Sequence, residues 1–333
     1  MKKRGIRGSL IAAAAASLLV LTSCGGGDDA PTDTEQEAAQ DGGELTQISV
    51  GVIPIVDVAP IYLGVQEGIF EEHGLDVELT LAQGGAAIIP AIQSGDFDFG
   101  FSNMTSLVIA KSQGLPLQLV APGPQTTGEP GSDFSSLLVP EDSEAESIVD
   151  LEGQRVAVNT LNNINDTVLK EGMRQEGGER DSMELVEVAF PDMGGQLESG
   201  NVDAIMAVEP FATLAKNAGA REIYSPYAQP IEDLMIAGYF TNTDKIENDP
   251  ELVDSFIAAM KESQQFAEDN PEAAKEILSE YTEIEPEVVE QLNMPRFPQE
   301  INRESTERII ELSEETGLIT ESVDINELIY EGS

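Results

Sequence analysis

Polar side chains that could hold a small molecule stand at the ends of predicted strands in this chain. Asp57 is a carboxylate in an apolar loop, a setting that suits a cation or a hydrogen-bond donor. Ser102 and Asn103 come directly before a predicted helix, where a hydroxyl, an amide and free backbone N–H groups could converge on one ligand. The stretch 159–165 also precedes a predicted helix and is rich in polar side chains, among them Asn159, Asn162 and Asn163. The chemistry these residues offer is hydrogen bonding.

Each of these residues also has an ordinary structural role open to it. Asp57 could bond to the backbone of its own turn, and Ser102 and Asn103 are common helix N-caps. Asn162 and Asn163 are residue types that favour turns. The sequence contains no Walker loop, G-x-G-x-x-G, H-E-x-x-H or C-x-x-C motif, so we predict no cofactor, no metal site and no enzymatic activity.

The elements that must position these residues alternate between strand and helix. Strands are predicted at 48–53, 75–81, 97–101, 117–121, 137–139, 155–159, 184–190, 204–208 and 235–240. The helices predicted between them cover 60–70, 86–93, 105–113, 164–172, 193–198 and 211–217, and a helical end covers 252–268, 271–281, 287–292 and 303–315. This alternation predicts an α/β fold with a mainly parallel sheet. The part of the chain after residue 46 is longer than a domain with a single hydrophobic core usually is, which indicates two lobes.

The same turn pattern occurs in both halves of the alternation. Residues 93–98 and 198–203 each carry Ser-Gly, two further residues, and then Asp at the start of a predicted strand. Glycine can take the left-handed helix cap, and the aspartate can accept hydrogen bonds in the turn. Finding the pattern twice supports two similar lobes.

The N-terminus has the features of an export signal. Four basic residues precede an apolar run over 10–21, which is too short to span a bilayer as a helix. The run ends in Leu21-Thr-Ser-Cys24, which resembles the lipobox of bacterial lipoproteins and contains the chain's one cysteine. The resemblance implies a signal peptide over 1–23 and a Cys24 that is acylated, followed by a disordered stalk over 24–46. The alternative is an ordinary signal peptide with an incidental cysteine.

The charge excludes some partners. Without residues 1–23, 13 Lys and Arg stand against 62 Asp and Glu, which gives a net charge of −49. Such a field repels nucleic acid and anionic lipid headgroups, so membrane attachment is expected through the lipid anchor alone. Solubility in a salty exterior is the plainer explanation of the acidity, and concentration of cations is the alternative.

Ordered motifs make the chain similar to a known family. They lie at 59–77, 94–100, 114–116, 150–158 and 200–210, and they begin with Ala59-Pro-Ile-Tyr-Leu-Gly and Gly74-Leu-Asp-Val. In this order they resemble the nitrate, sulfonate, taurine and thiamine-precursor binding proteins of ABC importers. The resemblance implies a two-lobed fold of the periplasmic-binding-protein type (type II). It assigns lobe I to 47–136 and 243–333, lobe II to 137–242, and a hinge to the two crossovers between them.

The resemblance also implies a site between the lobes, at the carboxyl ends of the strands. The loops there contain Asp57, Val58, Gly84, Gly85, Ser102, Asn103, Asn159, Asn162, Asn163 and Glu209. Glu209 is placed in the cleft by the resemblance, with a structural role as its alternative. Four residues are candidates for an aromatic wall, with a place in the core as their alternative: Tyr62, Phe134, Phe211 and Tyr239.

The implied function is the extracytoplasmic binding component of an importer, with permease subunits and a cytoplasmic ATPase as partners. The site loops contain Asp57, Asp192 and Glu209 but no basic residue, which favours a ligand with an amine or N–H group, such as a thiamine-pyrimidine precursor or an amino-sulfonate. A simple anion held by helix N-termini is the alternative. A synthase of the thiamine pyrimidine is a rival, but His73 and Cys24 are the chain's one histidine and one cysteine. An adhesive surface protein would fit the anchor but not the motifs.

Overall fold

The computed structural model describes residues 44–332. The predicted signal peptide, Cys24 and nearly all of the predicted stalk lie outside the described residues. The stalk was predicted to reach residue 46, but Thr46 already pairs with Leu75 and begins strand β1 (Thr46–Val52). Within residues 44–332, no helix is both long and apolar enough to cross a membrane.

Five strands form the first sheet, in the order β2-β1-β3-β10-β4. Besides β1 they are β2 (Leu75–Leu81), β3 (Phe99–Asn103), β4 (Leu117–Pro122) and β10 (Ala237–Asn242). β1 is parallel to β2 and β3, whereas β10 is antiparallel to β3 and β4. The assignment of residues 237–242 to lobe II is therefore wrong, because these residues pair within the first sheet.

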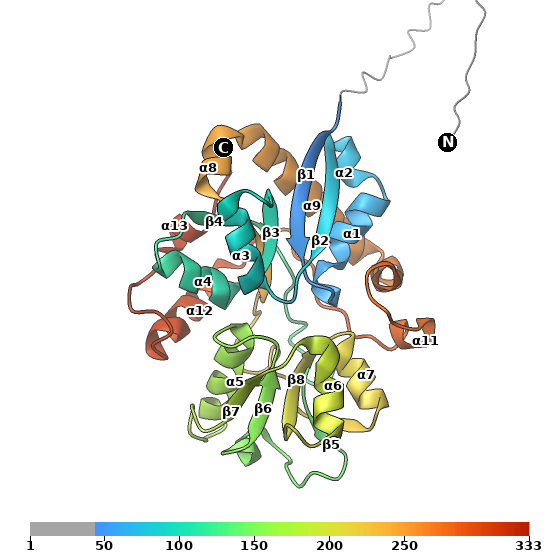
Figure 1. Ribbon diagram of the computed structural model, residues 1–333, viewed down its shortest axis with the longest axis vertical. Helices are drawn as coiled ribbons and strands as arrows, with labels where there is room; N and C mark the ends of the chain where they lie inside the picture. The colour runs from blue at the N-terminus through green and yellow to red at the C-terminus, as the bar shows by residue number, and fades with distance from the viewer. Residues whose placement is uncertain (1–43, 333) are drawn as a thin grey trace, which may run out of the picture. The chain divides into compact units, whose positions relative to one another are not determined.

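The second sheet has the order β7-β6-β8-β5-β9. Its strands are β5 (Ser135–Pro140), β6 (Arg155–Val158), β7 (Glu184–Glu187), β8 (Ala204–Val208) and β9 (Ala220–Tyr224). β6 is parallel to β7 and β8, and β5 is antiparallel to β8 and β9. Both sheets are thus mixed, where the sequence predicted a mainly parallel one, because β5 and β10 each run against their neighbours. Figure 1 shows the two sheets in separate α/β lobes.

Helices alternate with the strands along the chain and then form its C-terminal part. Seven belong to the alternating part: α1 (Ala59–Gln66), α2 (Ile69–Glu72), α3 (Gly85–Ser94), α4 (Met104–Ser112), α5 (Ile164–Gln175), α6 (Phe190–Glu198) and α7 (Phe211–Asn217). The helical end contains α8 (Thr243–Asn248), α9 (Pro250–Asp269), α10 (Pro271–Glu276), α11 (Pro286–Val289), α12 (Arg303–Glu315) and α13 (Ile325–Leu328). Short 3-10 helices cover Val56–Val58, Ile148–Leu151 and Ile277–Glu280.

Several predicted bounds were wrong for local reasons. The helix predicted at 60–70 is two helices, because Gly68 takes a left-handed φ of 77° between α1 and α2. The strand predicted at 184–190 ends at Glu187, because Phe190 and Pro191 begin α6. The strand predicted at 97–101 starts two residues later, because the N–H groups of Asp96 and Phe97 still bond to the end of α3. β9, α8 and α13 were not predicted.

The repeated Ser-Gly turn makes the same hydrogen bond in each sheet. Gly95 and Gly200 both take a left-handed φ, of 79° and 66°, as predicted. Asp98 then accepts a hydrogen bond from the N–H of Ser49 on β1 (2.8 Å), and Asp203 accepts one from the N–H of Arg155 on β6 (2.9 Å). The aspartate therefore ties the start of one strand to its parallel neighbour, which is a stronger reason for its presence than the turn alone.

Candidate functional site

A small cavity lies between the two sheets, at the carboxyl ends of β1, β3, β6 and β8. Its volume is about 20 Å³. Five of the predicted site residues line it: Asp57, Gly85, Asn103, Asn159 and Asn163. The other lining residues, most of them apolar, are Ile53, Ile55, Phe101, Ile164, Asn165, Phe190, Val208, Tyr227, Ile236 and Ala237. The structure therefore brings half of the predicted site residues together.

Among the described residues that line the cavity, Asp57 is the one with a carboxyl group. Its side chain lies in the 3-10 helix after β1 and is 3% exposed. Among the described residues, nothing donates a hydrogen bond to its Oδ2 atom. Burial raises the pKa of this carboxyl from 3.8 to about 8; a hydrogen bond from its own backbone N–H opposes the rise and the nearby Asp133 adds to it. A buried carboxyl oxygen without a partner is costly, so a donor from a ligand would be favourable here.

Gly85 and Ser102 lie against each other at the start of α3. A Cβ atom on Gly85 would stand 2.2 Å from Ser102 Oγ and 2.6 Å from Ser102 Cα, so only glycine fits. Ser102 Oγ is buried and has no hydrogen-bond partner among residues 44–332, although Ser102 is not among the cavity-lining residues. Gly84 faces the second lobe, where a Cβ would come within 3.1 Å of the Thr160 methyl group. Gly84 therefore lets the two lobes approach closely, whereas Gly85 lets α3 pack against β3 within the first lobe.

Asn103 joins the two lobes. Its Oδ1 atom accepts from the N–H of Ser106 (2.9 Å) and so caps α4, the structural alternative that the sequence left open. The same oxygen also accepts from the N–H of Ile164 at the start of α5 (3.2 Å). The side chain therefore satisfies free N–H groups at two helix N-termini, one from each lobe.

Three asparagines and a tyrosine form a hydrogen-bonded chain along the second lobe's side of the cavity. Asn163 caps α5 by accepting from the N–H groups of Asn165 and Asp166, and its Nδ2 donates to Asn159 Oδ1 (2.7 Å). Asn165 Nδ2 donates to the same oxygen (2.9 Å), and Asn165 Oδ1 accepts from the Tyr227 hydroxyl (2.7 Å). The sequence indicated Asn165 only as the last residue of the polar stretch 159–165, and it did not indicate Tyr227.

Asn162, Val58 and Glu209 are not among the cavity-lining residues. Asn162 is exposed, with a left-handed φ of 56°, as its turn alternative predicts. Val58 packs in the core. Glu209 is fully buried and accepts from the N–H and the hydroxyl of Thr213, at 2.9 and 2.8 Å. Burial raises the pKa of Glu209, although these bonds oppose the rise.

The aromatic residues at the cavity are not those that the sequence suggested. Phe101, Phe190 and Tyr227 line it, whereas Tyr62, Phe134, Phe211 and Tyr239 do not. Phe211 stacks on Phe190 with ring centroids 6.0 Å apart, so it supports the lining ring from behind. Tyr62 instead stacks on Tyr281 at 4.0 Å. In the sequence, the Phe190-Pro191 pair directly after a strand could have indicated Phe190 as a lining residue. Nothing in the sequence around Tyr227 indicated that this residue lines the cavity.

The cavity favours neutral or cationic groups over anions. Within the described part of the chain, its lining contains no Lys, Arg or His, and one carboxyl group faces it. No cluster of three or more potential metal ligands of the His, Cys, Asp or Glu type occurs in residues 44–332. A volume of about 20 Å³ holds roughly one water, while ligand sites usually measure hundreds of Å³. An organic ligand therefore requires the lobes to move apart.

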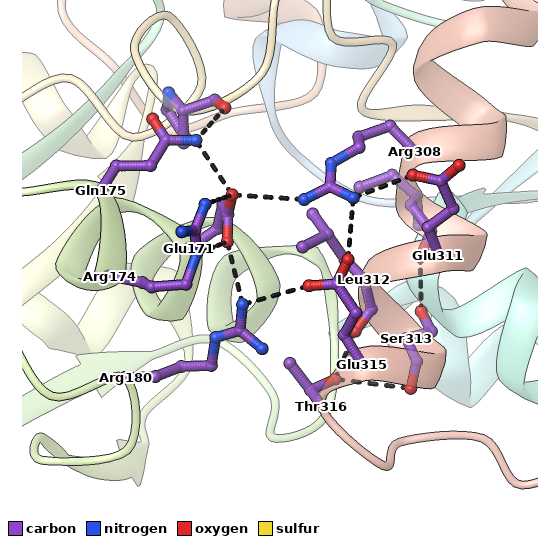
Figure 2. A network of polar contacts seen from close by, with 12 residues as sticks. Glu171, Arg174, Gln175, Arg180, Arg308, Glu311, Leu312, Ser313, Glu315 and Thr316 are labelled. Carbon is purple, nitrogen blue, oxygen red and sulfur yellow. Dashed lines mark hydrogen bonds and ion pairs between the residues drawn. The ribbon is translucent and has the colours of Figure 1, made fainter.

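A second set of contacts between the lobes lies on α5 and α12. Glu171 of α5 is 2% exposed and is bonded by Arg174 (2.7 Å) and by Arg180 and Arg308 (both 3.3 Å). Arg180 also pairs with Glu315 of α12 at 3.2 Å. Figure 2 shows the carboxylate of Glu171 among these guanidinium groups. Burial raises the pKa of Glu171, but the hydrogen bond from Arg174 and the neighbouring positive charges lower it to about 2, so the group stays ionised.

Replacing Glu171 with Gln should lower the free energy of unfolding by about 3 kcal/mol, because three arginines lose the carboxylate that they share. Glu311→Gln is the matched control, since Glu311 pairs with the same Arg308 at 2.9 Å but is 62% exposed and should contribute less than about 1 kcal/mol. Urea unfolding at neutral pH measures both. Equal losses in the two variants would contradict a special role for the buried carboxylate.

Comparisons with known proteins agree with this architecture. A family model described as NMT1/THI5 like matches residues 55–274. A formylaminopyrimidine-binding protein of Halalkalibacterium halodurans is 23% identical over 66% of this chain, and the match spans 64% of that relative's length. A yeast 4-amino-5-hydroxymethyl-2-methylpyrimidine phosphate synthase (Saccharomyces cerevisiae) is 25% identical over 72% of this chain and 70% of its own. The crystal structure of the periplasmic aliphatic sulphonate binding protein of Escherichia coli shares the fold, with a TM-score of 0.70, 18% identity, and coverage of 86% of this chain and 92% of that one.

Proposed function

Because the chain belongs to the NMT1/THI5-like family, we propose that it is a solute-binding protein that holds a small organic molecule between its two lobes. The observation that carries this proposal is the cavity itself, which lies between the sheets and contains an unpartnered buried carboxyl oxygen on Asp57. A purely structural protein gains nothing from such a group, because an unsatisfied buried polar atom costs stability.

The ligand that best matches the chemistry of this lining, once the lobes have moved apart, is an aminopyrimidine or a similar flat molecule with N–H groups. Phe101, Phe190 and Tyr227 supply aromatic surface, and Asp57 supplies an acceptor for an amine. The formylaminopyrimidine-binding relative supports this chemistry. Taurine and other amino-sulfonates share the amine, but their sulfonate would meet no positive charge among the described lining residues.

We further place the protein outside the cytoplasmic membrane, attached by a lipid on Cys24. The export signal and the lipobox-like ending of residues 1–24 support this location. The partners that follow are the permease subunits of an ABC importer with their cytoplasmic ATPase. A pyrimidine-synthase activity like that of the yeast relatives is the alternative. His73, the chain's one histidine, pairs with Glu262 at 2.9 Å and is not among the cavity-lining residues, which favours binding over catalysis.

A thermal-shift screen tests the proposed function. The purified protein is heated with 4-amino-2-methylpyrimidine, its N-formylaminomethyl derivative, taurine, ethanesulfonate or nitrate. Aminopyrimidines at 100 times their Kd should add about 2.7 kcal/mol of stability and raise the Tm by several degrees. The sulfonates and nitrate should leave it unchanged. A shift with nitrate or ethanesulfonate alone would favour the simple-anion alternative, and formation of a pyrimidine phosphate in a separate product assay would favour the synthase alternative.

A further inference from the structure

The three asparagines and Tyr227 beside the cavity form a row of hydrogen bonds. The donor and the acceptor of each bond can be assigned by starting from Asn163. Asn163 Oδ1 faces the backbone N–H groups of Asn165 and Asp166. A backbone N–H can only donate, so this atom is an oxygen and the other terminal atom of the Asn163 side chain is the NH₂ group. That NH₂ group lies 2.7 Å from Asn159, which must therefore present its oxygen.

The assignment then passes along the chain. Because Asn159 Oδ1 accepts at this point, the Asn165 atom 2.9 Å away from it must be a donor, Nδ2. Asn165 Oδ1 is left for the Tyr227 hydroxyl, which donates to it at 2.7 Å. Asn159 Oδ1 thus receives two donors, and the Asn159 NH₂ group must point the other way.

The NH₂ group of Asn159 is free to serve a ligand. Within residues 44–332 it makes no hydrogen bond. It lies toward the first lobe, 3.8 Å from where a Cβ atom on Gly84 would stand. Asn159 lines the same cavity as Asp57, whose Oδ2 atom is also unpartnered. One lobe therefore offers a fixed donor, and the other offers a carboxyl oxygen.

We infer that Asn159 is a specificity-determining residue that selects ligands carrying a hydrogen-bond acceptor, such as a ring nitrogen, opposite the N–H group that meets Asp57. This inference rests on the proposed function and names the pattern that the ligand must carry. A site with an oriented donor rejects an analogue that lacks the acceptor, because the half-exposed NH₂ group would then lose its contact with water under the ligand and stay unpaired. Asn163 acts as a positioning residue, since its contact with the α5 backbone sets the direction of the chain.

The test compares two probes that differ only in their ring atoms. 4-Amino-2-methylpyrimidine has two ring nitrogens, and 3-methylaniline has C–H groups in their place. Calorimetry on the wild-type protein should show a preference for the pyrimidine of at least tenfold. In Asn159→Leu and in Asn159→Asp, which keeps an acceptor for Asn163 and Asn165, the preference should fall to about threefold or less.

Two further variants separate positioning from packing. Asn163→Asp keeps the cap on α5 but offers no NH₂ group to Asn159, so the preference should also fall. Asn162→Gly, an exposed change in the same loop at a left-handed φ of 56° and outside the cavity lining, should keep the tenfold preference. Thermal melts confirm that each variant is folded. An undiminished preference in both Asn159 variants would overturn the inference alone, whereas failure of the wild type to bind either probe would overturn the proposed ligand class as well.

Discussion

Asp57→Asn is expected to remove a large pH-dependent loss of stability from the ligand-free protein. Burial raises the pKa of Asp57 from 3.8 to about 8 in the folded state. Between these values the folded protein holds a proton that the unfolded chain has released, so stability falls as the pH rises from 4 toward 8 and levels off above it. At about 1.4 kcal/mol per pH unit, the loss from pH 5 to pH 8 is on the order of 4 kcal/mol.

Chemical unfolding at pH 5, 6, 7 and 8 measures this loss. The wild-type curve should fall more steeply than that of Asp57→Asn. The difference between the two curves is the contribution of Asp57, because both proteins contain Asp166 and Glu209, whose pKa values burial also raises. Asp192→Asn, an exposed change in the first turn of α6, is the control and should follow the wild type. Parallel wild-type and Asp57→Asn curves would show that Asp57 is not buried as described.

Glu209→Ala is expected to act through stability and not through ligand affinity. The Glu209 carboxylate accepts from the N–H and the hydroxyl of Thr213 and from the N–H of Asn293 at 3.4 Å. Alanine leaves these donors unpaired and opens a cavity, which should lower the free energy of unfolding by about 2–4 kcal/mol. Glu198→Ala, at the exposed end of α6, should change it by less than about 0.5 kcal/mol.

Amide variants of Glu209 and Asp57 separate a structural role from a ligand-binding role. Glu209→Gln keeps most of the bonds to Thr213, so its affinity for an aminopyrimidine should stay within about threefold of the wild type. Above pH 8, where the Asp57 carboxyl is ionised, Asp57→Asn should weaken that affinity by roughly ten- to a hundredfold, since a charge-assisted hydrogen bond is lost. A large loss of affinity in Glu209→Gln would show that Glu209 contacts the ligand, as the sequence resemblance implied.

The alternating α/β architecture could be predicted because strand and helix leave periodic patterns in the sequence. The two copies of the Ser-Gly turn, ending at Asp98 and Asp203, even revealed the similarity of the two lobes. The antiparallel courses of β5 and β10 were missed, because a strand's sequence does not state which neighbour it will pair with. β9 was missed because its four half-buried residues and one buried residue show no alternation.

A residue of the candidate site could be predicted only where its neighbours in the sequence determine its environment. Asp57 stood out as a charge in an apolar loop, and it lines the cavity without a hydrogen-bond partner for Oδ2 among the described residues. Glu209 looked equivalent, but its partners on Thr213 and Asn293 come from the fold and are invisible in the sequence. Tyr227 reaches the cavity from a loop about 60 residues beyond Asn165, so no local pattern could indicate it.

Hydrogen–deuterium exchange with and without an aminopyrimidine tests most directly whether the ligand is held between the lobes. Saturation of the wild-type protein should slow exchange both in the segments that follow β1 and β6, which carry Asp57 and Asn159, and at the end of β3, which carries Asn103. Protection on both lobes is the expected result, because the ligand closes one onto the other. Protection confined to a single lobe, or to a surface away from this cavity, would contradict the account.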